Sequence, residues 1–92
     1  MPVVWIPALL RDLVDGQESV AVSGETVREA VDALDERYPG IKARLFEGDR
    51  LRPGITVVVD GEVTGQRLRT RLGENSEVHF LPALSGGAQE RK

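Results

Sequence analysis

The chain opens with two short hydrophobic runs that have the spacing of strands. Val3 to Ile6 is β-branched and aromatic, and it ends at Pro7, which has no N–H to donate to a neighbouring strand. Glu18 to Val22 alternates polar and apolar side chains with the period of a half-buried strand. Because the turn signal Asp15-Gly16 lies between them, we expect these strands to pair as a hairpin.

After Ser23-Gly24 the apolar residues recur every three or four positions, which predicts a helix. Its apolar stripe consists of Val27, Ala30, Val31 and Leu34, and its exposed side of Arg28, Glu29, Asp32, Asp35 and Glu36. Thr26 and Glu29 have the spacing of a capping box, in which the hydroxyl accepts from a free N–H and the glutamate reaches back. Tyr38-Pro39-Gly40 ends the helix, because a residue before proline avoids the helical region.

The middle of the chain contains the strongest strand pattern. Ile41 to Phe46 fits one helical turn, and Glu47 to Gly54, with its glycines, proline and charges, predicts a surface loop. Ile55 to Val59 is then continuously apolar or β-branched. The hairpin signal Asp60-Gly61 follows, so we expect a return strand at Glu62-Val63.

The last element is a strand from Glu77 to Leu81. Gln66 to Leu72, before it, is basic and irregular, with Leu68 and Leu72 available as anchors, and a turn is expected at residues 73–76. One helix packed on one mixed sheet of four to five strands belongs to the α+β class.

Size and charge exclude several classes of function. A chain of 92 residues forms one domain, which is too small for a large cleft enclosing both substrate and cofactor. The formal net charge is -3 and no basic cluster is dense enough to track a phosphate backbone, so nucleic acid is not expected as a partner. The chain shows neither a signal peptide nor an apolar stretch of membrane-spanning length, so we expect a cytoplasmic protein without a membrane partner.

The residues that usually carry chemistry are scarce. Without cysteine the chain has no disulfide, no thiolate nucleophile and no cysteine-ligated metal. His79 is the only histidine and is expected to face solvent in mid-strand, so no metal site is predicted. Ser85 has no base placed beside it in sequence, and flexibility is its expected role.

The segment after the last strand carries the strongest functional signal. It reads Leu81-Pro82-Ala83-Leu84-Ser85-Gly86-Gly87, followed by residues 88–92. Glycine tolerates nearly any backbone angle, so a Gly-Gly segment can thread a channel too narrow for other residues. We divide the chain into a domain at residues 1–85 and a tail at 86–92. The alternative is that Gly86 and Gly87 only begin a disordered terminus.

Strand alternation predicts which side chains are available to a partner. Val78 and Phe80 are expected to face the helix, which sends His79 and Leu81 to the opposite face. In the first strand Val4 and Ile6 share the core parity, which leaves Trp5 outward. The candidate docking residues are Trp5, Leu81, Pro82 and Leu84, since exposed apolar anchors are typical of interfaces. The alternative is that Trp5 is a core residue, because a shift of one residue exchanges the two faces.

Four motifs in this order resemble the ThiS/MoaD family of ubiquitin-like sulfur carriers. They are Thr26-Val27-x-x-Ala30, Val57-x-Val59-Asp60-Gly61-Glu62, Glu77-Val78-x-Phe80-Leu81-Pro82 and Ser85-Gly86-Gly87. The resemblance implies a β-grasp fold with the first and last strands side by side. Two departures are Glu74-Asn75-Ser76-Glu77, where the family often has Asp-Gly-Asp-Glu, and Ala88 to Lys92, because ordinary members end at the second glycine. Asparagine tolerates the left-handed conformation, so the turn can survive.

The resemblance also implies a mechanism in which the protein is a substrate of its partners and not an enzyme. A JAMM-type metalloprotease would cut between Gly87 and Ala88, and an adenylyltransferase of the ubiquitin-activating type would use ATP and magnesium to activate the Gly87 carboxyl. Conversion to a thiocarboxylate would then deliver sulfur to a biosynthetic enzyme for cysteine, thiamin, molybdopterin or a natural product. No cofactor or metal is expected in the chain itself. The alternatives are a ubiquitin-like modifier conjugated through Gly87 to lysines, and an interaction module with an inert tail.

Overall fold

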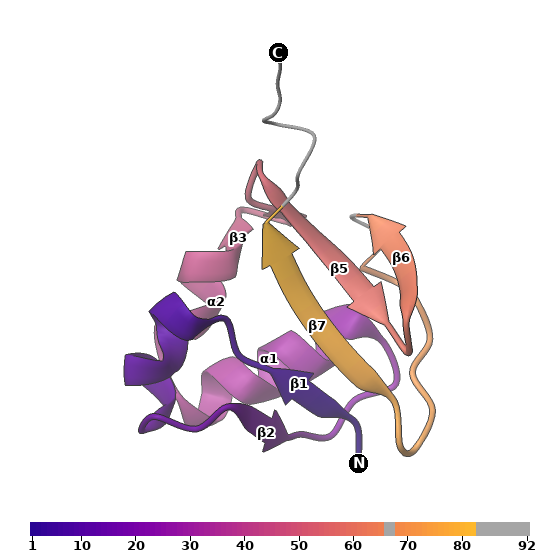
Figure 1. Ribbon diagram of the computed structural model, residues 1–92, viewed down its shortest axis with the longest axis horizontal. Coiled ribbons are helices and arrows are strands. Elements are labelled where there is room, and N and C mark those ends of the chain that lie inside the picture. The colour runs from indigo at the N-terminus through magenta and orange to yellow at the C-terminus, as the bar shows by residue number, and fades with distance from the viewer. Residues whose placement is uncertain (66–67, 83–92) are drawn as a thin grey trace.

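A five-stranded mixed sheet forms the centre of the computed structural model, which describes residues 1–65 and 68–82 (Figure 1). In spatial order its strands are β2 (Ser19–Ala21), β1 (Val3–Trp5), β7 (Glu77–Pro82), β5 (Ile55–Val59) and β6 (Glu62–Gly65). β1 and β7 run parallel, and the other neighbours run antiparallel. The expected α+β class, the β1–β2 hairpin and the contact between first and last strands are therefore confirmed.

The link between β1 and β2 contains a helical segment that the pattern did not predict. It is a 3₁₀ helix, η1 (Ala8–Val14), which begins after Pro7 and ends where Asp15 takes the left-handed conformation. Leu10 and Val14 are buried, whereas Leu9 points outward and is 90% exposed. A 3₁₀ helix brings residues three apart onto one side. Its apolar residues therefore match neither the period of two of a strand nor the period of 3.6 of an α-helix, and the sequence pattern did not predict it.

The main helix, α1 (Val27–Arg37), covers one face of the sheet and lies behind it in Figure 1. Its predicted apolar stripe is fully buried. Thr26 Oγ1 accepts from the N–H of Glu29 at 3.2 Å, as the capping box requires. The Glu29 carboxylate accepts from the N–H of Glu25 at 3.0 Å, so it reaches one residue beyond the cap residue that the motif predicts.

The first turn of α1 also depends on the segment before β7. The N–H of Val27 donates to the carbonyl of Thr70 at 3.1 Å, and that of Arg28 donates to the carbonyl of Leu68 at 3.0 Å. These bonds satisfy N–H groups that have no partner within the helix. Leu68 and Leu72 pack against the core, as predicted. The irregular segment therefore fixes one end of α1 and is not merely a surface connection.

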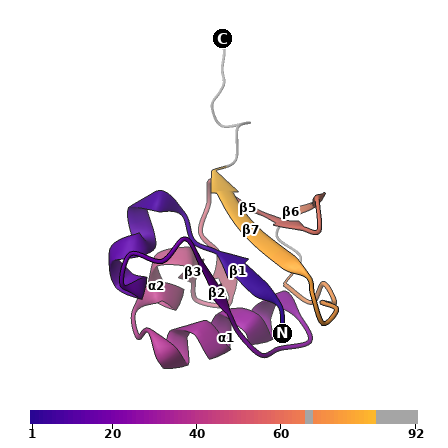
Figure 2. The ribbon, with the colours of Figure 1, turned by 60° about the horizontal axis from the view of Figure 1, so that its bottom comes forward.

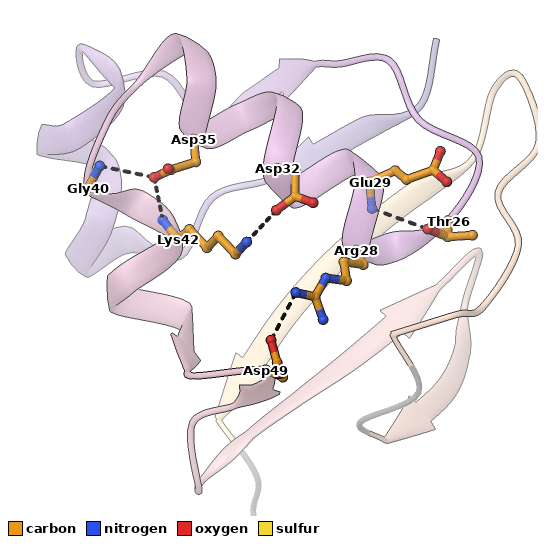
Figure 3. A network of polar contacts seen from close by, with 8 residues as sticks. All are labelled: Thr26, Arg28, Glu29, Asp32, Asp35, Gly40, Lys42 and Asp49. Atoms are coloured by element: carbon orange, nitrogen blue, oxygen red, sulfur yellow. Dashed lines mark hydrogen bonds and ion pairs between the residues drawn. The ribbon is translucent and has the colours of Figure 1, made fainter.

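The charged side of α1 makes specific contacts with the elements beside it (Figure 3). Asp35 Oδ1 accepts from the N–H groups of Gly40 and Lys42, both at 3.0 Å, and so caps α2 (Ile41–Leu45). The Lys42 ammonium binds the carboxylate of Asp32. These carboxylates lie on the predicted exposed side of α1, and Asp32 and Asp35 in addition position α2.

The expected loop from Glu47 to Gly54 is partly a short hairpin. β3 (Phe46–Glu47) pairs with β4 (Arg50–Leu51), and Leu51 is buried. Arg28 of α1 binds Asp49 in the turn at 3.1 Å. Strands of two residues are too short to show an alternation of polar and apolar side chains. The charges and glycines of residues 47–54 therefore predicted a loop.

The start of β7 is fixed by a side-chain network around Asp60. Asp60 and Gly61 form the predicted hairpin turn, with φ values of 51° and 86°. Asp60 accepts from the N–H of Glu77 at 2.8 Å and from the hydroxyl of Ser76 at 2.9 Å. The Ser76 hydroxyl in turn accepts from the N–H of Gly73 at 2.7 Å, so Ser76, rather than a left-handed Asn75, closes this turn.

Gly24, immediately before α1, offers a test of how tightly the helix is seated. Its φ is 151°, and a Cβ there would lie 2.7 Å from the backbone nitrogen of Ala30. Gly24→Ala should therefore lower the free energy of unfolding by about 3 kcal/mol, since backbone strain and a backbone clash add. Gly16, with φ 78° and open space around it, is the matched control, and Gly16→Ala should cost roughly 1 kcal/mol.

Urea denaturation of both variants measures the difference. Equal losses for Gly24→Ala and Gly16→Ala would mean that α1 can move away from the sheet edge at little cost, contrary to the tight approach described.

Candidate functional site

The candidate site residues follow β7, the last strand of the chain, which is hydrogen-bonded to a neighbouring strand on both of its edges. β7 pairs with β1 on one side and with β5 on the other, and the pairs Thr56–Leu81 and Ile55–Pro82 extend the second pairing to the end of the strand. Figure 1 shows β7 ending at the edge of the domain remote from the N-terminus. The predicted site residues Leu84, Gly86, Gly87 and Ala88 lie outside the described residues. The structure therefore describes the domain up to Pro82, and these site residues follow Pro82 in the sequence.

Figure 2 shows α1 against one face of the sheet, and the alternation of buried and exposed residues defines the opposite face. Val4, Ile6, Val78 and Phe80 are buried, as predicted. Trp5 and His79 are half-buried on the opposite face, and Leu81 is 46% exposed. This excludes the alternative in which Trp5 is a core residue. That Trp5, Leu81 and Pro82 contact a partner stays a prediction.

Trp5 and His79 form a stacked pair across β1 and β7. Their ring centroids lie 5.5 Å apart with an interplanar angle of 6°. The pair forms because parallel pairing places Trp5 directly beside His79. The imidazole Nε2 also lies 3.6 Å from a carboxylate oxygen of Glu77. His79 thus faces away from the core, as predicted, and is partly covered by Trp5 and Glu77.

The stack belongs to a row of side chains that crosses the sheet. His79 lies beside Val58 of β5, and Val58 lies beside Val63 of β6, whose side chain is 74% exposed. We call Trp5, Val58, Val63, His79 and Leu81 the outer face. Neighbouring exposed apolar groups on a small domain mark interaction surfaces, whereas isolated ones do not.

One polar atom on the outer face lacks a partner. Trp5 Nε1 is buried and makes no hydrogen bond, and it is the one side-chain atom of residues 1–65 and 68–82 in this condition. A buried indole N–H normally finds an acceptor, so an unpaired one calls for a reason. A surface that gains an acceptor when a partner binds would supply that reason.

Two neighbouring grooves flank Leu81 where β7 ends. The first, of about 300 Å³, lies between η1, α2 and β5 and is lined by Leu9, Leu10, Leu45 and Ile55 among others. The second, of about 310 Å³, lies over the Trp5–His79 stack and includes Arg11. Leu81 lines both. Sequence analysis missed the contributions of η1 and α2, because these elements join the site only through tertiary packing.

Within residues 1–65 and 68–82, no group of three or more histidine, aspartate or glutamate side chains is arranged to hold a metal ion. His79 contacts Trp5 and Glu77, which is not the arrangement of a base activating a nucleophile. None of the helices in the described part of the chain is long and apolar enough to cross a membrane.

Comparison with known proteins relates this arrangement to one family. The model of the ThiS family matches residues 4–87. The sulfur carrier protein CysO of Mycobacterium tuberculosis is 33% identical over an alignment of 89 residues, which covers 91% of this chain and 96% of that protein.

Solved structures give the same result and confirm the expected β-grasp, ubiquitin-like fold. A chain in the crystal structure of the Amycolatopsis orientalis BexX/CysO complex is 35% identical, with a TM-score of 0.82, and the match covers 95% of this chain and 100% of that chain. Small archaeal modifier protein 1 from Methanosarcina acetivorans is 31% identical, with a TM-score of 0.74 and coverage of 94% and 95%.

Trp5 is the only tryptophan, so its fluorescence reports on the outer face. His79→Ala uncovers one face of the indole ring, and we expect its emission maximum to move to longer wavelength. Loss of the stacked pair should also lower the free energy of unfolding by about 1 kcal/mol. Glu77→Ala is the control, because it removes the neighbouring carboxylate and leaves the stack in place. Identical emission spectra for His79→Ala and the wild type would show that the stack does not persist in solution.

Proposed function

Since the chain belongs to the ThiS family, we propose that it is a sulfur carrier protein that works through the carboxyl group of Gly87. Removal of the residues after Gly87 frees this carboxyl, a partner enzyme adenylates it, and a thiocarboxylate forms. The thiocarboxylate then donates sulfur in a biosynthetic pathway. The related CysO proteins are sulfur carriers by name, which supports the general role.

The observation that carries this proposal is the position of β7. This strand is paired on both sides and ends at Pro82, so the tail leaves from a fixed point of the sheet. From Pro82 to Gly87 an extended chain spans at most about 17 Å. That reach lets Gly86 and Gly87 enter the active site of a partner while the domain stays docked outside. Glycine at both positions keeps the end of this segment narrow.

The chemistry proceeds in two substitutions. An oxygen of the Gly87 carboxylate attacks the α-phosphorus of ATP, and pyrophosphate leaves, which makes the acyl carbon electrophilic. Hydrosulfide from a sulfur donor then attacks this carbon, the C–S bond forms, the C–O bond to AMP breaks, AMP departs, and the S–H proton is lost to solvent. The product is a thiocarboxylate whose sulfur is a stronger nucleophile than the original oxygen, as thiolates are relative to hydroxyls.

The catalytic groups for these steps belong to the partners. They are an adenylyltransferase of the ubiquitin-activating type that uses ATP and magnesium, a JAMM-type metalloprotease that cuts after Gly87, and a sulfur-accepting biosynthetic enzyme. The crystallised complex of a CysO with BexX supports a mode of action through protein partners. The need for ATP is consistent with a cytoplasmic location.

The second candidate is a ubiquitin-like modifier. The similarity to small archaeal modifier protein 1 favours it, because that protein has the same fold and is a modifier by name. The two functions share the activation of Gly87 and differ in the acceptor. In the modifier the acyl group passes to a lysine amine of a target protein, with formation of an isopeptide bond.

Intact mass spectrometry after expression beside the partner enzymes separates the possibilities. A chain ending at Gly87 with one oxygen replaced by sulfur supports the carrier. Lysine-linked adducts support the modifier. A chain that keeps its residues after Gly87 and gains no sulfur would show an interaction module with an inert tail, and would overturn the proposal.

Gly87→Ala tests the assignment of the reactive residue. Because Gly87 lies beyond the last sheet pair at Pro82, the variant should unfold at the wild-type urea concentration. The added methyl group should nevertheless impede entry into the partner's channel, and we expect adenylation, measured by ATP–pyrophosphate exchange, to fall at least tenfold, about 1.4 kcal/mol.

The control is Ser85→Ala, in the same tail, which should retain wild-type exchange. If Gly87→Ala were adenylated and thiocarboxylated at the wild-type rate, Gly87 would not be the residue on which the chemistry occurs.

A further inference from the structure

The two grooves beside Leu81 have a charge opposite to that of the whole protein. The chain carries a formal net charge of -3, yet no described residue that lines either groove is acidic. The charged or titratable groups there are Arg44 in the first groove and Arg11 and His79 in the second. We call these two grooves together the tail-root surface.

Both arginines are available to an outside carboxylate. Neither forms an ion pair with an acidic side chain of residues 1–65 and 68–82. Arg11 donates from Nε to the carbonyl oxygen of Ile6 at 3.2 Å, which fixes its side chain at the end of β1 and leaves its terminal N–H groups free to donate. Arg44 is exposed on the last turn of α2.

Apolar side chains occupy the space between these charges. Leu9 is 90% exposed and Leu81 is 46% exposed, and both line the first groove with Leu10, Leu45 and Ile55. Burying such side chains against a partner is favourable at about 25 cal/mol per Å² of apolar surface. The surface thus combines an apolar floor with basic edges.

From these features we infer that the tail-root surface binds an acidic segment of the adenylating partner that carries at least one apolar side chain. The apolar side chain packs between Leu9 and Leu81, and carboxylates of the segment pair with Arg44 and Arg11. The inference rests on the proposed function, because the surface adjoins Pro82 and a partner bound there is held beside the tail.

The basic groups and the apolar floor of the tail-root surface have separate roles in binding. The basic groups attract the acidic segment over distances of about one Debye length and orient the encounter. The apolar contacts then determine how long the complex lasts. Docking therefore precedes insertion of the tail and does not require any group on residues after Pro82.

The test uses the chain that ends at Gly87, the form whose carboxyl is free in the proposed function, and the ubiquitin-activating-type adenylyltransferase of the same organism. Arg44→Glu should weaken binding, measured by calorimetric titration, by about tenfold, and should flatten the dependence of Kd on salt concentration. In ATP–pyrophosphate exchange the KM for the carrier should rise by a similar factor with kcat unchanged. Leu9→Asp should have an effect of at least the same size, and its near-complete exposure leaves folding unaffected.

Two variants serve as controls. Arg69→Glu makes the same change of charge at an exposed residue that lines neither groove, and should bind as the wild type does. Arg44→Lys keeps the positive charge and should restore most of the affinity lost in Arg44→Glu.

The outcomes separate this inference from the proposed function. If the wild type is adenylated and Arg44→Glu, Leu9→Asp and Arg69→Glu all bind equally well, the tail-root surface is not the docking site, and the carrier function stands. If the wild type is neither bound nor adenylated, both fail. If instead the wild type dimerises and Leu9→Asp makes it monomeric in sedimentation, the surface is occupied by a second copy of the chain, and the inference is wrong.

Discussion

The pairing of β7 on both of its edges is the constraint on which the rest of the molecule depends. The parallel pairing with β1 joins the first strand of the chain to the last, and the antiparallel pairing with β5 joins the β2–β1–β7 part of the sheet to β5 and β6. The contacts of Asp60 with Ser76 and Glu77 fix where the strand starts. A shift of β7 by one residue would bury His79 and expose Phe80, so a stable core and a correctly placed tail are the same requirement.

In the proposed function, the same constraint lets a small domain take part in chemistry whose catalytic groups belong to its partners. The carboxylates of α1 and its neighbours are used to position α2 and the β3–β4 turn, as Asp35 and Asp49 show. The core supplies stability, and the proposal assigns partner contacts to the domain surface and the reaction to Gly87. Ordering the two glycines at 86 and 87 inside a domain would be costly in backbone entropy, which favours their use outside it.

The sequence predicted the elements whose signals are local, and missed those that depend on distant neighbours. The period of two in β7, the apolar stripe of α1 and the turn at Asp60-Gly61 can each be read from adjacent residues, and all three are confirmed. The Trp5–His79 stack depends on the register between strands far apart in the chain, which no local pattern specifies. The contribution of Arg44 to the surface near Leu81 likewise exists only because α2 packs beside β5 and η1.

The distribution of charge on the surface also affects how the protein meets a partner. A protein with net charge -3 approaches most acidic surfaces unfavourably, so the arginines beside Leu81, in grooves with no acidic lining residue, give an encounter with an acidic partner a preferred orientation. In the proposed function, partners that differ in the reaction they perform on Gly87 share one docking geometry, because docking uses the described domain and the chemistry uses residues after Pro82. Since each partner must release the carrier after its step, moderate affinity set by a few exposed side chains such as Leu9 and Leu81 suits the role better than an extensive buried interface.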